Sequence, residues 1–207
     1  MEAAPRKSFS MIRSLALADV VTMGNAACGT GAIFACLAYL DERRASWLWL
    51  ALGLLPVALI CDVADGSIAR WRRKHSPIGA DLDSLADVVS FGVAPAVLGF
   101  TLGLRGGWDA LALLYFVACG IARLARYNVT ASSLSDDSGK VKYYEGTPIP
   151  TSLAIVLAWA VAFSQQRIGD ATWLGVAQFG PWRLHPLALM YVGSGSLMIS
   201  TIRIPKP

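Results

Sequence analysis

Long apolar segments constrain this chain more than any other feature of its sequence. A helix that crosses about 30 Å of bilayer hydrocarbon needs about 20 consecutive apolar residues. Six segments approach or exceed this length: 17–40, 46–64, 80–103, 108–128, 148–165 and 184–202. Hydrophobic residues make up 55% of the 207 residues and charged residues only 15%, which is too apolar for a soluble domain of this size. The sequence therefore predicts an all-α integral membrane protein, in which 1–207 form a single domain with a bundle of six transmembrane helices.

The N-terminal segment, residues 1–16, precedes the first apolar run. Phe9, Ile12 and Leu15 recur at near-helical spacing beside Arg6 and Arg13. This pattern is typical of a helix that lies on an anionic membrane surface. The segment is therefore either an interfacial juxtamembrane helix or the first turns of the first transmembrane helix.

The distribution of basic residues predicts how the bundle is oriented. With six spans, thirteen of the eighteen Lys and Arg residues lie on the side of the termini. Cytoplasmic segments carry the excess of Lys and Arg in most membrane proteins. We therefore expect a multi-pass protein of a prokaryotic inner membrane, with both termini and the loop that joins the second and third spans in the cytoplasm.

The stretch "CDVADGSIARWRRKHSPIGADLDSLAD", residues 61–87, contains five of the fourteen acidic residues. A charge at membrane depth costs at least ~2.5–3.5 kcal/mol on insertion scales, so acidic residues beside apolar helices indicate a functional site. Asp62 and Asp65 are three residues apart, and Asp83 and Asp87 are four apart, so each pair lies on one face of its helix.

A short loop between the two helices allows the two acidic faces to meet. Four converging carboxylates repel one another unless some are protonated or a cation binds between them. Oxygen ligands without His or Cys favour Mg²⁺, Mn²⁺ or Ca²⁺, and four carboxylates suit a two-metal site for phosphoryl transfer. The alternative is an interfacial salt-bridge network with the basic residues that follow: Arg70, Arg72, Arg73 and Lys74.

Small residues accompany the acidic pairs. Gly66 and Ala69 lie on or beside the face of the first pair, and Gly79 lies one turn before Asp83. They leave room for a ligand to approach the backbone closely. Arg70 has a planar guanidinium that can reach phosphate oxygens.

Eight of these positions, at fixed spacing, resemble the signature of the CDP-alcohol phosphotransferase family. They are Asp62, Asp65, Gly66, Ala69, Arg70, Gly79, Asp83 and Asp87. The resemblance implies an integral membrane enzyme with a six-helix core, usually a homodimer. It also implies transfer of a phosphatidyl or similar group from a CDP-linked lipid to an alcohol.

The resemblance further implies roles for individual residues. Asp62, Asp65 and Asp83 would hold one divalent cation, Mg²⁺ or Mn²⁺, and Asp62, Asp83 and Asp87 would hold a second. Asp87 would also serve as the general base. The CDP-lipid would be bound by residues of the motif and of the first helix: Asp19, Thr22, Gly66, Ala69, Arg70, Ser76 and Gly79.

Three further stretches resemble the phosphatidylserine synthase branch of this family. They are "LDSLADVVSFGVAPA" (82–96), "ARLARYNV" (122–129) with "EGTPIPTS" (145–152), and "SGSLMISTIRIP" (194–205). The likeness implies CDP-diacylglycerol and L-serine as substrates, with CMP released, and no nucleic-acid partner is expected.

Other acceptors and other classes of protein remain as alternatives. Arg123 and Arg126, three apart on a helix end, could hold the serine carboxylate or the phosphate of glycerol phosphate or inositol phosphate. A headgroup or positive-inside role would explain them equally well. A cation-binding transporter would carry its acidic residues at mid-span or in broken helices, whereas a non-catalytic adaptor would tolerate loss of the aspartates.

Overall fold

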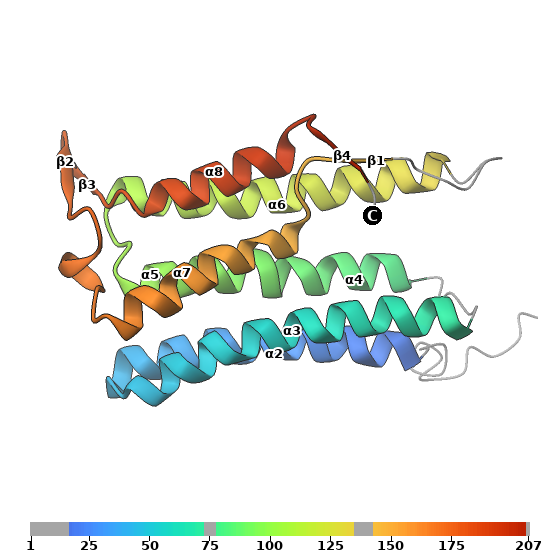
Figure 1. Cartoon of the computed structure of the whole chain (residues 1–207), viewed down its shortest axis with the longest axis horizontal. Helices are drawn as coiled ribbons and strands as arrows, with labels where there is room; N and C mark the ends of the chain where they lie inside the picture. The colour runs from blue at the N-terminus through green and yellow to red at the C-terminus, as the bar shows by residue number, and fades with distance from the viewer. Residues whose placement is uncertain (1–16, 73–77, 135–142, 206–207) are drawn as a thin grey trace, which may run out of the picture.

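The protein is a bundle of helices that run along the long axis of the molecule (Figure 1). The computed structural model describes residues 17–72, 78–134 and 143–205, so the predicted juxtamembrane segment 1–16 lies outside the described residues. The helices are α2 (Leu17–Glu42), α3 (Ala45–Arg72), α4 (Gly79–Asp87), α5 (Ala94–Leu102), α6 (Gly107–Leu134), α7 (Leu153–Ser164) and α8 (Ala188–Ile199).

Four segments of the described chain are long and apolar enough to cross a membrane. They are Leu17–Glu42, Ala45–Ile68, Gly79–Leu102 and Gly107–Val129, and they coincide with the first four predicted runs. The last two predicted runs form shorter apolar helices, Ile149–Ser164 and Ala188–Ile199. The structure thus confirms four helices of the predicted length and apolar character.

Two helices continue beyond the apolar runs that predicted them. α3 extends to Arg72 and α6 to Leu134, although the apolar runs end near residues 64 and 128. Backbone hydrogen bonding carries a helix on through polar residues until a breaker or a cap stops it. As a result, α3 carries Asp62 and Asp65 on a continuous helix.

Two small antiparallel ribbons depart from the all-α prediction. β1 (Tyr143–Glu145) pairs with β4 (Arg203–Pro205), and β2 (Ala177–Phe179) pairs with β3 (Trp182–Leu184). Strands of three residues are too short to produce an alternating pattern of their own, so the sequence gives no periodic signal for them. The first ribbon ties the C-terminal segment to the chain that leads into α7.

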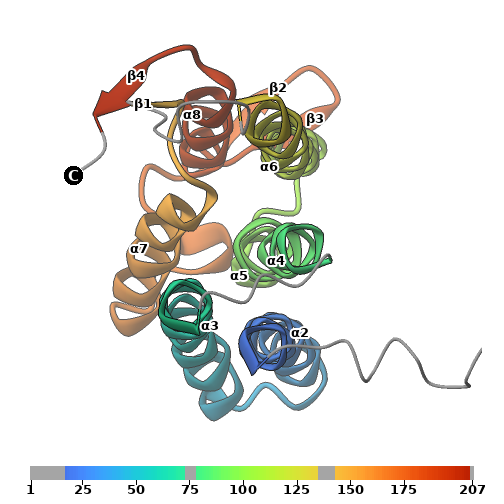
Figure 2. The same ribbon diagram turned by 90° about the vertical axis from the view of Figure 1, so that its right-hand side faces the viewer.

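α4, the turn that follows it and α5 form one continuous helical rod, residues 79–102, and the other helices are arranged around this α4–α5 rod (Figure 2). α2 and α3 form an antiparallel pair that reverses at Arg43, whose φ is 57°. α2 packs against the α4–α5 rod, α6 packs beside α8, and α7 contacts both α3 and α5. The α4–α5 rod therefore lies between the α2–α3 pair and the α6–α8 pair.

Buried hydrogen bonds connect α7 and α8 to this rod. Trp159 on α7 donates from Nε1 to the Tyr191 hydroxyl on α8 at 3.0 Å, and that hydroxyl donates to the Pro95 carbonyl at 2.7 Å. Both hydrogen bonds lie in the core, where Trp159 and Tyr191 are fully buried. Gly99 permits the close approach, because a side chain there would overlap the Tyr191 hydroxyl.

One widened turn interrupts the rod between α4 and α5. Residues Val88–Val93 form a π-helical turn, in which the Ala94 N–H bonds to the Val89 carbonyl five residues back. Pro95 follows directly and has no N–H to donate, a common setting for such interruptions. The turn begins immediately after Asp87, and π-helical turns are frequent beside functional sites.

Candidate active site

Two helices bring three aspartates together at one end of the bundle. Asp62 comes from α3, and Asp83 and Asp87 come from α4. Each offers a carboxylate oxygen, and these oxygens all lie within 4.8 Å of one another. The spacing of three and four residues keeps each acidic pair on one helix face, and packing of both helices on α2 turns these faces toward each other.

Asp65 lies at the edge of this cluster. Its carboxylate is buried, 6% exposed, and Oδ2 accepts a hydrogen bond from the Thr22 hydroxyl at 2.6 Å. It lies within electrostatic range of Asp62 and Asp83. All four predicted acidic residues therefore share one region, with Asp65 held by α2.

Thr22 lies on the side of α2 that faces the acidic cluster. Its hydroxyl is buried against Asp65, and the Ala18 carbonyl at 3.1 Å is the second acceptor within reach. Asp19, one turn earlier on α2, is also buried and interacts electrostatically with Asp65. In the structure, both residues line the inner side of the acidic cluster.

Asn25 is a residue of the site that the sequence interpretation missed. Its side chain is fully buried, and its amide Nδ2 donates to Asp87 Oδ1 at 3.1 Å. The Ser90 hydroxyl donates to the Asn25 carbonyl at 2.9 Å. A signal was present, because Asp19, Thr22 and Asn25 recur every three residues on one face of an otherwise apolar helix.

Gly29 explains how α2 comes so close to the widened turn. A Cβ at this position would overlap the side chain and Cα of Ser90. Without a side chain there, α2 can lie directly against Val88–Val93, which brings Asn25 within hydrogen-bonding distance of Asp87. The absence of a side chain at Gly29 thus allows the Asn25 amide to reach Asp87.

The remaining residues predicted to contact the CDP-lipid lie at the end of α3, at the start of α4 and between these two helices. Gly66 is on α3, and a Cβ there would meet no atom within 4 Å, so open space lies beside it. Gly79 is the first residue of α4. The backbone of Ala69 and Arg70 belongs to the last turns of α3, their side chains are outside the described part, and Ser76 lies outside the described residues.

The two predicted acceptor residues lie on α6 in unlike surroundings. The Arg123 side chain is buried, 9% exposed, whereas Arg126 is exposed. α6 reaches α4 near this point, where Ser84 and Asn128 exchange hydrogen bonds at 3.0–3.1 Å. Of the two arginines, Arg123 is the one enclosed within the bundle.

Comparison with known proteins agrees with this geometry. A model of the family described as CDP-alcohol phosphatidyltransferase matches residues 15–191. The chain is similar to the CDP-diacylglycerol--serine O-phosphatidyltransferase of Saccharomyces cerevisiae, with 41% identity over 203 residues, which is 96% of this chain and 74% of the relative.

Two further relatives carry the same name. The protein of Methanocaldococcus jannaschii is 30% identical over 198 residues, 96% of this chain and 78% of the relative. The protein of Mycobacterium tuberculosis H37Rv is 31% identical over 159 residues, 75% of this chain and 51% of the relative. The family match covers most of the chain, including all four aspartates, and the chain therefore belongs to the CDP-alcohol phosphatidyltransferase family.

Proposed function

We propose that this enzyme transfers the phosphatidyl group of CDP-diacylglycerol to the hydroxyl of L-serine, giving phosphatidylserine and CMP. The observation that carries the reaction class is the meeting of the Asp62, Asp83 and Asp87 carboxylates within 4.8 Å. Serine as the acceptor is supported by the shared name of the relatives, of which the yeast protein is 41% identical.

The acidic cluster fits divalent metal ions. Asp83 Oδ1 is buried and has no hydrogen-bond partner among the described residues, so it is an oxygen with an unused acceptor site beside two other carboxylates. We assign Asp62, Asp65 and Asp83 to one cation and Asp62, Asp83 and Asp87 to a second, with Mg²⁺ or Mn²⁺ preferred and Ca²⁺ compatible with the same oxygen ligands. When bound, such ions neutralise the pyrophosphate and stabilise the departing CMP.

Asp87 is assigned the proton transfer. Asn25 holds Oδ1 by a hydrogen bond, and Oδ2 is the atom that we assign to accept the serine proton. The serine oxygen then forms a bond to the phosphorus that carries diacylglycerol, and the bond from that phosphorus to the CMP oxygen breaks. Alignment of the hydroxyl with the phosphorus, by helices that hold both substrates, supplies a large part of the rate.

Residues around the cluster are assigned to the CDP-lipid. The open space beside Gly66 admits a ligand close to the α3 backbone. The remaining assignments follow the family signature and the segment of α2 that faces the cluster: Asp19, Thr22, Ala69, Arg70, Ser76 and Gly79. Because Thr22 donates to Asp65, we assign it the additional role of orienting that carboxylate.

Arg123 is the stronger of the two assignments for the acceptor. It is enclosed within the bundle on α6, which contacts α4 through Ser84 and Asn128. A guanidinium there can bind the serine carboxylate. Arg126, which is exposed, is also compatible with a headgroup contact at the membrane surface.

We further propose that all six apolar segments cross the membrane, with the acidic cluster and both termini on the cytoplasmic side. The shorter segments Ile149–Ser164 and Ala188–Ile199 lie within the bundle beside the long helices (Figures 1 and 2), which supports their inclusion. The excess of basic residues on the side of the cluster supports the orientation. A homodimer and a prokaryotic inner membrane stay predictions, and the relatives include a yeast protein.

The decisive assay measures CMP release by purified enzyme in detergent with CDP-diacylglycerol. Release is expected to require L-serine, to stop on addition of EDTA and to return with excess Mg²⁺ or Mn²⁺. Glycerol 3-phosphate and inositol phosphate, tested in place of serine, should support no comparable release. Asp170→Asn, a change in an exposed aspartate far from the cluster, serves as the matched control for Asp62→Asn.

The possible results of this assay separate an error in the acceptor from an error in the site. Release that is stimulated by one of the two phosphate acceptors, and not by serine, would keep the chemistry and change the acceptor. CMP release that survives EDTA, or Asp62→Asn with full activity, would contradict the proposed site.

A further inference from the structure

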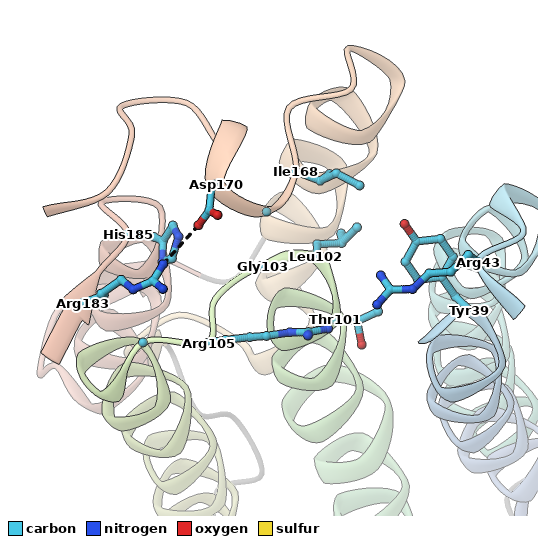
Figure 3. Close-up of a pocket in the computed structure, with 12 residues that line it drawn as sticks. Tyr39, Arg43, Thr101, Leu102, Gly103, Arg105, Ile168, Asp170, Arg183 and His185 are labelled. Carbon is cyan, nitrogen blue, oxygen red and sulfur yellow. Dashed lines mark hydrogen bonds and ion pairs between the residues drawn. The ribbon is translucent and has the colours of Figure 1, made fainter. Parts of the chain in front are cut away.

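A cavity of about 390 Å³, whose lining residues are drawn in Figure 3, lies toward the other end of the bundle from the acidic cluster. It is formed where the α2–α3 turn, the end of α5 and the loops around η3 (Gly169–Ala171) and β3 come together. Fourteen residues separate Asp87 from Thr101 on the α4–α5 rod, which is about 21 Å at 1.5 Å per residue. The cavity is therefore separate from the site described above, and its size is that of a small-ligand pocket.

Three arginines dominate the lining of this cavity. Arg183 forms an ion pair with Asp170 at 3.3 Å. Arg43 and Arg105 form no ion pair with a carboxylate of the described residues, and their guanidinium groups lie over the rings of Tyr39 and Phe100, at 5.8 and 5.6 Å. The lining thus carries more positive than negative charge.

A buried histidine adds a polar atom to the same lining. His185 is only 3% exposed, and its Nδ1 lies 2.6 Å from Asp109 Oδ2, while its backbone N–H donates to Asp109 Oδ1 at 2.7 Å. Nε2, on the other side of the ring, is buried and has no hydrogen-bond partner among the described residues. The two hydrogen-bonding contacts with Asp109 fix the position of the ring at the edge of the cavity.

The backbone around the cavity is closely fitted. A Cβ on Gly106 would overlap the Arg183 carbonyl, and a Cβ on Gly103, whose φ is 137°, would overlap the backbone of Gly169. The Gly106 N–H also donates to Asp109 Oδ2 at 2.8 Å. These contacts hold the α5–α6 loop, which carries Arg105, against the segments that carry Arg183 and His185.

We propose that this cavity binds a phosphate-bearing anion. The planar guanidinium groups of Arg43 and Arg105 suit the non-bridging oxygens of a phosphate. Two sources share this chemistry, the headgroup of a phospholipid in the leaflet opposite the acidic cluster and free phosphate. Binding here is independent of the proposed transfer reaction.

The test is a calorimetric titration of the purified enzyme in detergent, with EDTA present so that metal at the acidic cluster cannot bridge to phosphate. One arm uses a short-chain phosphatidylglycerol and the other uses inorganic phosphate at constant ionic strength. Arg105→Gln should weaken binding of the true ligand about tenfold or more, because a charge-assisted hydrogen-bonding group is removed. Arg105→Lys, which keeps the charge without the planar fork, should lose less.

Arg167→Gln is the matched control, because Arg167 is exposed on the same side of the bundle and does not line the cavity. CMP release by Arg105→Gln should equal that of the unmodified enzyme, which shows that the variant is folded. If that variant does not fold, Arg43→Gln replaces it.

Selective loss of phosphatidylglycerol binding identifies the lipid headgroup, and loss of phosphate binding alone identifies the free anion. Loss of both shows that the phosphate group itself is recognised. No saturable binding in either arm, or equal affinities in Arg105→Gln and Arg167→Gln, would overturn the anion site.

Discussion

The Asp87 carboxylate is held by an amide that comes from a different helix. Asn25 donates to Oδ1 from within a buried environment, where a hydrogen bond to a charged group contributes about 1.5–3 kcal/mol. Asn25→Ala should therefore lower kcat for CMP release by about tenfold or more, with little change in KM for CDP-diacylglycerol. Steady-state kinetics would measure both constants.

Asn128→Ala provides the comparison for this variant. Asn128 is also an amide between helices, but it bonds to Ser84 and to no carboxylate in the described part of the chain. If both variants lost kcat equally, Asn25 would serve only to pack α2 against α4.

Asp87 is assigned two roles, as metal ligand and as proton acceptor. Asp87→Asn keeps the size and one oxygen but removes the proton acceptor, so the transfer rate should fall by roughly 10² or more. Binding of CDP-diacylglycerol, measured by calorimetry, should fall only modestly. Recovery of activity at high metal concentration would show instead that Asp87 acts only as a ligand.

At the scale of the element, the approach of α2 to the widened turn depends on Gly29. Gly29→Ala places a Cβ against Ser90, and either the helices separate or the turn shifts, at a cost of about 1–3 kcal/mol. The thermal midpoint in detergent should fall by several degrees. CMP release should fall with it, because Asn25 moves away from Asp87.

Gly53 on α3 is the matched glycine, since a Cβ there meets no atom within 4 Å. Gly53→Ala should leave the thermal midpoint unchanged or raise it. Alanine is more favourable than glycine within a helix by up to about 1 kcal/mol. Equal destabilisation by both substitutions would indicate that Gly29 contributes backbone flexibility rather than close packing.

The whole molecule has two chemically different ends. One carries the acidic cluster, and the other carries the cavity with Arg43, Arg105 and Arg183, whose side chains Figure 3 shows. Under the proposed orientation, the first end faces the cytoplasm and the second faces the opposite aqueous side.

Cysteine labelling tests this orientation. In a background without the four native cysteines, Trp71→Cys and Arg167→Cys introduce thiols at exposed positions near the two ends. In intact cells, a membrane-impermeant maleimide should label residue 167 and should reach residue 71 only after the membrane is opened. The reverse pattern would invert the topology.

Local properties of the sequence determined the helices and the acidic pairs. The length of an apolar run sets whether a helix can span a bilayer, and spacings of three and four residues set which carboxylates share a face. These depend on neighbouring residues alone. For this reason the first four predicted runs match four long apolar helices of the structure, and Asp62, Asp65, Asp83 and Asp87 could be selected before any fold was known.

Only the tertiary structure decided which residues of different helices meet. The contact of Asn25 with Asp87 spans 62 positions and depends on Gly29 lying against Ser90. The cavity likewise brings together arginines from the α2–α3 turn, the α5–α6 loop and β3, which no spacing in the chain relates. Spacing encodes a helix face, whereas the partner of that face is set by packing of the whole bundle, because small and large residues must interlock across distant segments.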